Sequence, residues 1–186
     1  MTPPKPFCFN PKKIKAFVLG CDPTNFSDNG KPAQLDFAFG ITQDNRYFKG
    51  ILTNLNQIGL HLEDIYVQNL VTEYQEQETA KNKNWKATAK NFIQNREREF
   101  DLVDESCKKP VFITSKILYD VLLKPTEKIA DAKDLYDLRI PVPIPAEANW
   151  LGRPLIPLFR HYKYQLKNYP QYIKHIKAVL FFSQSE

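Results

Sequence analysis

The sequence predicts an α/β/α fold of three layers, with a central, mostly parallel four-stranded sheet and helices on both of its faces. Two observations predict it. Short apolar runs typical of buried strands alternate along the chain with longer segments in which apolar residues recur at helical spacing. The length of 186 residues suits one domain, and no internal repeat or linker divides the chain. We therefore expect residues 1–186 to form a single domain.

Four segments have the features of buried strands. They are Ile14–Gly20, Asp64–Leu70, Pro110–Ser115 and Arg153–His161. Pro157 interrupts the last one and has no N–H to donate to a neighbouring strand, which indicates an edge position. Residues 1–13 precede the first strand and are rich in Pro and Lys, so we expect a surface lead-in there.

Helical periodicity marks the segments between and after these strands. The predicted helices are residues 45–58, 85–103, 116–123 and 169–182. Turn-forming residues make 21–32 a loop, and the polar segment 71–83 is predicted to be an exposed loop. Several prolines leave residues 124–153 without an assigned element.

The composition is that of a soluble globular protein. Hydrophobic residues make up 42% and charged residues 25% of the chain, which excludes collagen, a coiled coil and wholesale disorder. The three cysteines are odd in number and widely spaced, as free thiols in a reducing compartment are. Residues 1–13 have no apolar run of the length expected for a signal peptide, and no stretch approaches the ~20 apolar residues of a membrane span. We expect a cytoplasmic protein with no membrane partner.

The net charge of +5 comes from the last fifth of the chain. Between Ala148 and Ser185 there is no Asp or Glu, while six residues there are Lys or Arg. A basic surface of this kind suits a polyanion such as nucleic acid. A solvated helix face that happens to lack acidic residues explains the same charge distribution equally well.

Candidate site residues follow the predicted strands. Parallel strands bring their carboxyl ends to one edge of a sheet, where ligands bind in open α/β folds. The residues at these ends are Gly20, Cys21, Asp22 and Pro23 after the first strand, Asn69 after the second, Ser115 and Lys116 after the third, and Arg160 and His161 after the fourth. Phe37 and Phe39, near the first loop, are candidates for an aromatic wall.

Hydrolysis of an N-glycosidic bond needs side chains of these types. It builds a cationic sugar and an anionic base, so it needs an Asp to orient water and stabilise the cation. A His stabilises the departing anion. An Asn reads the edge of the base, and an aromatic ring stacks on it.

Five segments, in this order, resemble motifs of the uracil-DNA glycosylase superfamily. They are VLGCDPTNF (18–26), LDFAFGI (35–41), IGLHLEDIYVQNLV (58–71), KPVFITSKILYDVLL (109–123) and PLIPLFRHY (154–162). The resemblance extends over about residues 14–180. It implies a DNA glycosylase of base excision repair, acting as a monomer without metal or other cofactor, that removes uracil or a related damaged pyrimidine after the base has flipped out of the stack.

The resemblance also implies a role for each matched residue. Asp22 positions the attacking water and His161 stabilises the departing base, which makes these two the catalytic residues. Substrate contacts fall to Gly20, Cys21, Pro23, Phe39 and Asn69, and contacts with the DNA backbone fall to Arg160, Lys163, Ser115 and Lys116.

The main departures of the chain from the family pattern are at three places, and Ile113-Thr114-Ser115 is a milder one because it lacks the usual Gly. Cys21 replaces a Gln, Thr24 stands where many members have a Tyr that excludes thymine, and the sequence YKY follows His161 in place of the usual wedge segment. The four cysteines of the iron–sulfur branch are absent. Two alternatives stay open: a glycosylase-like nucleic-acid-binding module without catalysis, and a hydrolase of free nucleosides.

Overall fold

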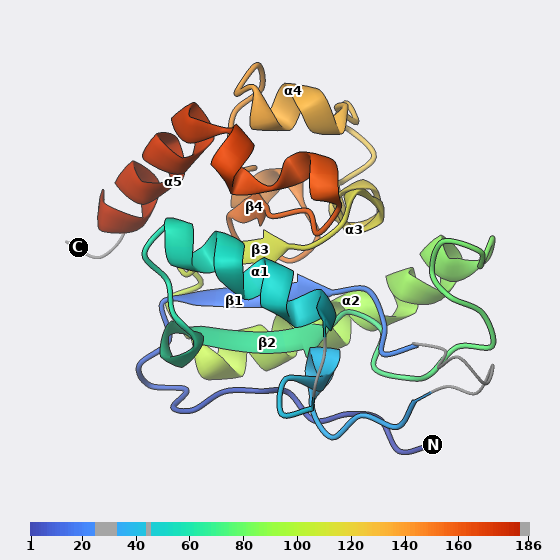
Figure 1. The fold of residues 1–186 in the computed structure, drawn as a ribbon. Helices are drawn as coiled ribbons and strands as arrows, with labels where there is room; N and C mark the ends of the chain where they lie inside the picture. The colour runs from blue at the N-terminus through green and yellow to red at the C-terminus, as the bar shows by residue number, and fades with distance from the viewer. Residues whose placement is uncertain (25–32, 44–45, 183–186) are drawn as a thin grey trace.

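A four-stranded parallel sheet forms the centre of the computed structural model, which describes residues 1–24, 33–43 and 46–182 (Figure 1). The strands lie in the order β2-β1-β3-β4. Their bounds are Ala16–Gly20 for β1, Ile65–Asn69 for β2, Val111–Ile113 for β3 and Leu155–Pro157 for β4. The predicted parallel sheet is confirmed, and Pro157 lies in an edge strand because β4 pairs only with β3 in this sheet.

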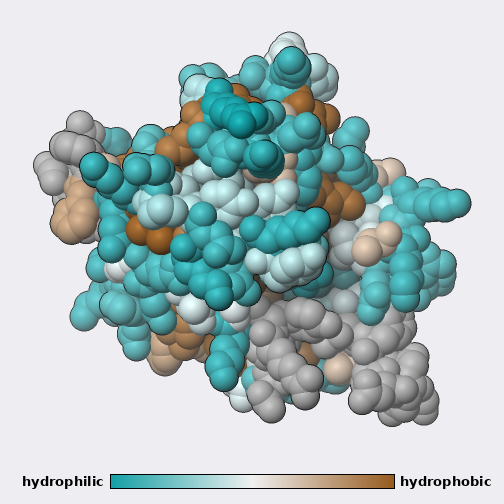
Figure 2. Space-filling view, turned by 45° about the horizontal axis from the view of Figure 1, so that its top comes forward, coloured by the Kyte–Doolittle hydropathy of each residue, from teal (hydrophilic) through white to brown (hydrophobic). Residues whose placement is uncertain are grey.

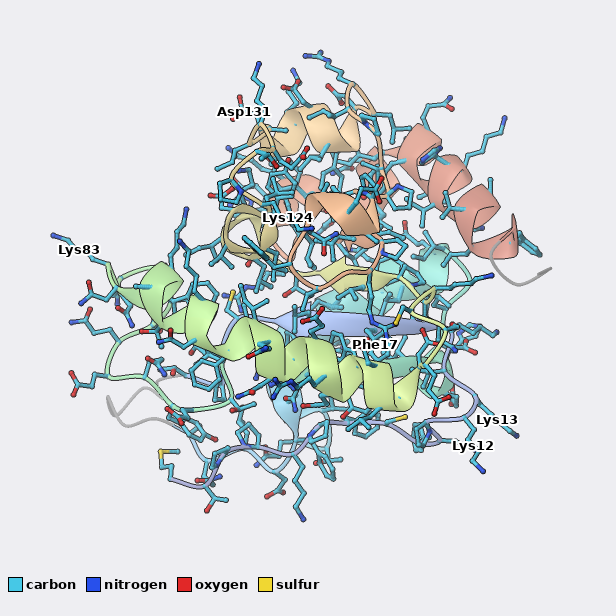
Figure 3. All side chains as sticks on the ribbon, turned by 180° about the vertical axis from the view of Figure 1, so that it is seen from behind. Lys12, Lys13, Phe17, Lys83, Lys124 and Asp131 are labelled. Atoms are coloured by element: carbon cyan, nitrogen blue, oxygen red, sulfur yellow. The ribbon has the colours of Figure 1, made fainter. Side chains whose placement is uncertain are left out.

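Helices cover both faces of the sheet, which confirms the predicted α/β/α fold (Figure 1). The helices are α1 (Arg46–Gln57), α2 (Trp85–Val103), α3 (Lys116–Leu122), α4 (Ala132–Tyr136) and α5 (Pro170–Phe182). Seen from behind, α2 lies across the sheet in front of β1, close to Phe17 (Figure 3). Phe100 of α2 stacks on Phe17, with ring centroids 4.2 Å apart. This contact anchors the long helix to the central strand.

The N-terminal segment is more than the predicted surface lead-in. Phe7 is buried and pairs with Val67 of β2 in an antiparallel bridge. The Phe7 N–H donates to the Val67 carbonyl at 2.9 Å, and the Val67 N–H donates back at 2.8 Å. The segment therefore covers the outer edge of β2, where unpaired backbone groups would otherwise invite another strand.

Arg153 is one of the six basic residues between Ala148 and Ser185, but it is buried inside the protein. Its guanidinium donates to Asp104 at 2.7 Å and to Asp101 at 2.7 Å, and it lies 5.1 Å from the centre of the Phe17 ring. The basic segment therefore presents five cations to solvent rather than six. They are Arg160, Lys163, Lys167, Lys174 and Lys177.

The face of the molecule that carries α4 is mainly polar in the part that the structure describes (Figure 2). On the face that carries α4, hydrophilic side chains predominate and hydrophobic residues form small separate areas (Figure 2). None of the helices in the described ranges is both long and apolar enough to cross a membrane.

Candidate active site

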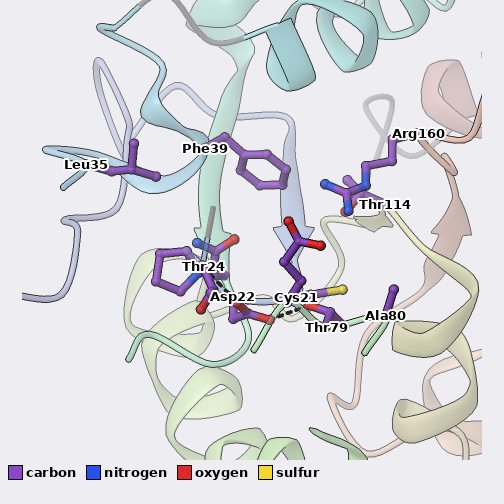
Figure 4. Close-up of a pocket in the computed structure, with 12 residues that line it drawn as sticks. Cys21, Asp22, Thr24, Leu35, Phe39, Thr79, Ala80, Thr114 and Arg160 are labelled. Carbon is purple, nitrogen blue, oxygen red and sulfur yellow. Dashed lines mark hydrogen bonds between the residues drawn. The ribbon is translucent and has the colours of Figure 1, made fainter. Parts of the chain in front are cut away.

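A cavity of about 150 Å³ lies at the carboxyl edge of the sheet, where strand order predicts a ligand site (Figure 4). It is lined by residues from the carboxyl ends of all four strands and from two loops. They are Cys21, Asp22, Pro23, Thr24, Leu35, Phe39, Asn69, Glu78, Thr79, Ala80, Thr114 and Arg160. Six of the predicted site residues are therefore brought together: Cys21, Asp22, Pro23, Phe39, Asn69 and Arg160.

Gly20 ends β1 directly beside Asn69 at the end of β2, because the two residues are partners in the parallel pairing. A Cβ atom on Gly20 would lie 2.3 Å from Asn69 Oδ1 and 2.4 Å from Phe39 Cζ, closer than real Cβ contacts come. Only glycine leaves room here for both side chains. The absence of a side chain at Gly20 therefore lets Asn69 and Phe39 lie against the end of β1.

The Phe39 backbone has φ +59°, in the left-handed region that non-glycine residues seldom occupy. Such a conformation costs about 1–3 kcal/mol and persists where the surroundings impose it. The Phe39 ring lies against Gly20 and 5.6 Å from the ring of Phe48. Phe37, the alternative candidate, instead makes an edge contact with Phe7 at 5.6 Å. Of the two rings, Phe39 is the one that lines the cavity.

Asn69 is the most informative polar group in the cavity wall. Its side chain is 2% exposed, and Nδ2 has no hydrogen-bond partner in the described part of the chain. A buried donor left without a partner costs about 1–3 kcal/mol, so such groups are rare in native proteins. An unpaired amide in the wall of a cavity is available to donate to an acceptor on a bound molecule.

Asp22 is held by three donors from different parts of the chain. Its Oδ1 accepts from the Thr24 N–H at 2.9 Å. Its Oδ2 accepts from the Trp85 indole N–H at 2.8 Å and from the Thr79 hydroxyl. Trp85 is the first residue of α2 and is fully buried, so this helix fixes the direction of the carboxylate.

Cys21 faces Ser115, with 3.0 Å between Sγ and Oγ. Burial raises the pKa of the Cys21 thiol to about 11, so the thiol stays protonated near neutral pH and is a poor nucleophile. The Ser115 hydroxyl also accepts from the Leu118 N–H at 3.4 Å and caps α3. Lys116 pairs with Asp120 at 2.5 Å. The predicted DNA-contact side chains after β3 therefore bind groups of the protein itself in this structure.

Arg160, rather than His161, lines the cavity, and the guanidinium points into it across from Phe39 (Figure 4). The Arg160 N–H donates to the Thr114 carbonyl at 3.0 Å, which continues the pairing of the chain beyond β4. His161 follows at a bend of the chain, just before the 3-10 helix Tyr162–Tyr164. His161 is exposed, its ring 4.5 Å from that of Tyr162, and its Nδ1 accepts from the Lys163 N–H at 3.3 Å.

The loop between β2 and α2 supplies three cavity residues that sequence reasoning missed. The segment 71–83 is polar and was expected to be exposed, yet Glu78, Thr79 and Ala80 line the cavity. Thr79 donates to Asp22 and so fastens the loop to the first strand end. The signal in the sequence was positional, because this loop leaves the carboxyl end of a strand that already carries Asn69.

No protein-family model matches the sequence, and no curated protein matches it. Across residues 1–24, 33–43 and 46–182, no three His, Cys, Asp or Glu side chains are grouped so as to hold a metal ion.

Proposed function

We propose that the protein is a DNA glycosylase that hydrolyses the N-glycosidic bond of uracil or a related damaged pyrimidine. One observation carries the proposal: the buried amide of Asn69, without a partner for Nδ2, stands in the wall of a small cavity beside the Phe39 ring. A pyrimidine carbonyl is a hydrogen-bond acceptor on a flat ring. The carbonyl oxygen accepts the hydrogen bond of the Asn69 amide, while the face of the pyrimidine ring stacks on Phe39.

The volume of the cavity fits one base. A cavity of about 150 Å³ elsewhere accommodates benzene, a single six-membered ring. The cavity here also measures about 150 Å³. A base in duplex DNA reaches such a space only after leaving the stack, which a damaged or mispaired base does at least cost.

The charged groups of the cavity suit the two charges that develop in this reaction. A bond forms between the water oxygen and C1′ of the sugar, and the C1′–N bond breaks with its electron pair going to the base. The Asp22 carboxylate stabilises the cationic sugar and orients the water. The Arg160 guanidinium, in the same cavity, stabilises the anionic base.

The exposed cations near the cavity support a DNA partner. Arg160 lines the cavity, and Lys163 and Lys167 follow it on the surface. No acidic residue occurs between Ala148 and Ser185 to offset them. Contacts with phosphates release counterions, so we expect DNA binding to weaken steeply as salt increases.

A base-release assay tests the proposal. A labelled oligonucleotide with one uracil, single-stranded or opposite G or A, is incubated with excess protein in EDTA and then treated with alkali to cleave abasic sites. We expect a cleaved band with the wild-type protein. The rate of base release should fall by about 100-fold or more in Asp22→Asn. No cleavage of uracil or of a panel of damaged pyrimidines rejects the proposal.

A second candidate function is a nucleic-acid-binding module without catalysis. The observation in its favour is that His161, the residue matched to the family's catalytic His, is exposed and does not line the cavity. This candidate predicts salt-sensitive binding of oligonucleotides without release of any base. Fluorescence anisotropy measures the binding, and the base-release assay measures the release.

A further inference from the structure

The cavity holds a second carboxylate, Glu78, besides that of Asp22. Glu78 immediately precedes Thr79, whose hydroxyl donates to Asp22, so the backbone here is fastened beside the first carboxylate. Two carboxylates near one glycosidic bond can have different roles: one stabilises the cationic sugar, and the other accepts a proton from the attacking water.

The hydrogen bonds of Asp22 leave it little capacity to take that proton. A carboxylate has about four lone-pair positions for donors. Three of those on Asp22 are occupied, by the Thr24 N–H, the Trp85 indole and the Thr79 hydroxyl. The remaining position suffices to orient a water. A proton on Asp22 would take this last position from the water and would remove the negative charge that strengthens the three hydrogen bonds and stabilises the cationic sugar.

Glu78 is held far more loosely. Its Oε2 lies 3.5 Å from Lys81 Nζ, the side chains are 42% and 77% exposed respectively, and such exposed pairs contribute little. The Glu78 carboxylate therefore exchanges this partner for a water at small cost. It also stands in the wall of the cavity that contains the unpaired Asn69 amide.

We infer that Glu78 is the general base of the proposed glycosylase, a role that rests on the proposed function. Glu78 takes a proton from the attacking water as the water oxygen bonds to C1′. Asp22 orients this water and stabilises the cationic sugar. The electron pair of the broken C1′–N bond leaves with the base as an anion beside Arg160, so the reaction needs no co-reactant but water.

The test compares the single-turnover rate of base release in Glu78→Gln and Glu78→Ala with that of the wild-type protein across a range of pH. General base catalysis contributes about 100-fold or more, so we expect a loss of that size in Glu78→Gln. We also expect the loss to shrink as the pH rises, because hydroxide attacks C1′ without a general base. Added formate is expected to restore part of the rate in Glu78→Ala, an effect that a structural role does not produce.

Two controls lie in the same loop. Glu76→Gln removes an exposed carboxylate outside the cavity lining, and Lys81→Met removes the weak partner of Glu78. Both are expected to keep the wild-type rate and pH profile. A Glu78→Gln variant with the full rate and an unchanged profile, beside an inactive Asp22→Asn, overturns the inference and leaves the proposed function intact. A wild-type protein that releases no base overturns both.

Discussion

Gly20 and Asn69 end neighbouring parallel strands so closely that a methyl group on the glycine would lie 2.3 Å from the amide oxygen of the asparagine. The same methyl group would overlap the Phe39 ring at 2.4 Å. The place where a base would lie is therefore defined by the missing side chain of Gly20 as much as by the two side chains beside it.

We expect Gly20→Ala to lower kcat/KM for base release by at least about 10-fold, because a displacement of the reading groups by about 1 Å is costly in catalysis. The fold should persist, since Asn69 and Phe39 can turn away from the methyl group. Gly50→Ala is the matched control: it lies on α1 with no atom within 4 Å of the added Cβ. That variant should keep full activity and gain up to about 1 kcal/mol in stability from helix propensity. Equal activity in both variants would contradict the steric argument.

Asn69→Leu should separate stability from activity. The substitution removes a buried amide whose Nδ2 has no partner, which relieves a cost of about 1–3 kcal/mol. We expect the free energy of unfolding in urea to stay the same or rise, while base release falls about 100-fold or more through loss of the reading group. A clear loss of stability would mean that the amide serves the fold and not a ligand.

The sequence supports the fold more fully than the site. The bounds of α2 were predicted at residues 85–103 and confirmed there, because a buried residue recurs every three or four positions along the helix. The strand-end rule also brought Asp22 and Asn69 to one cavity. Periodicity reports burial, however, and it says little about the direction of a side chain just past the end of a strand.

Because periodicity reports burial and not side-chain direction, the structure differs from the sequence prediction at two main places. Arg160 and His161 are neighbours beyond the end of β4, where the chain bends at His161, and the sequence has no signal for the direction of either side chain there. The loop that carries Glu78 and Thr79 is polar because it binds Asp22 and lines a cavity. A polar segment, taken from the sequence alone, predicts an exposed loop. The left-handed Phe39 has no local sequence signal, since it is imposed by its packing.

Arg160→Gln should reduce base release far more than His161→Ala, because only Arg160 lines the cavity. Removal of one group that stabilises developing charge costs about 100- to 1,000-fold. The size of the loss should depend on the leaving group: 5-fluorouracil leaves as a more stable anion than uracil, so Arg160→Gln should affect its release less. Rates for both bases in both variants check this. A larger loss in His161→Ala would restore the histidine to the catalytic role.

Arg153→Met should destabilise the fold without direct effect on the cavity, since Arg153 pairs with Asp104 and Asp101 away from it. Removal of one partner from a buried ion pair costs about 3–5 kcal/mol. Arg139→Met, which breaks exposed pairs with Asp134 and Asp137, is the control and should cost about 0–1 kcal/mol. Urea unfolding at pH 7 measures both. Equal stabilities would show that Arg153 contributes no more than a surface cation.

The same pair gives the protein a pH dependence of definite sign. Burial alone would raise the pKa of the Asp104 carboxyl, but hydrogen bonds from Lys109, Ser106 and Arg153 outweigh it and hold that pKa well below its usual range. Stability from Asp104 is therefore complete above its unfolded-state pKa of about 3.9 and is lost as the pH falls below that value. In Arg153→Met the folded-state pKa rises because one donor is gone. The difference in unfolding free energy between wild type and variant should then narrow from pH 5 to pH 2, whereas a constant difference would contradict this linkage.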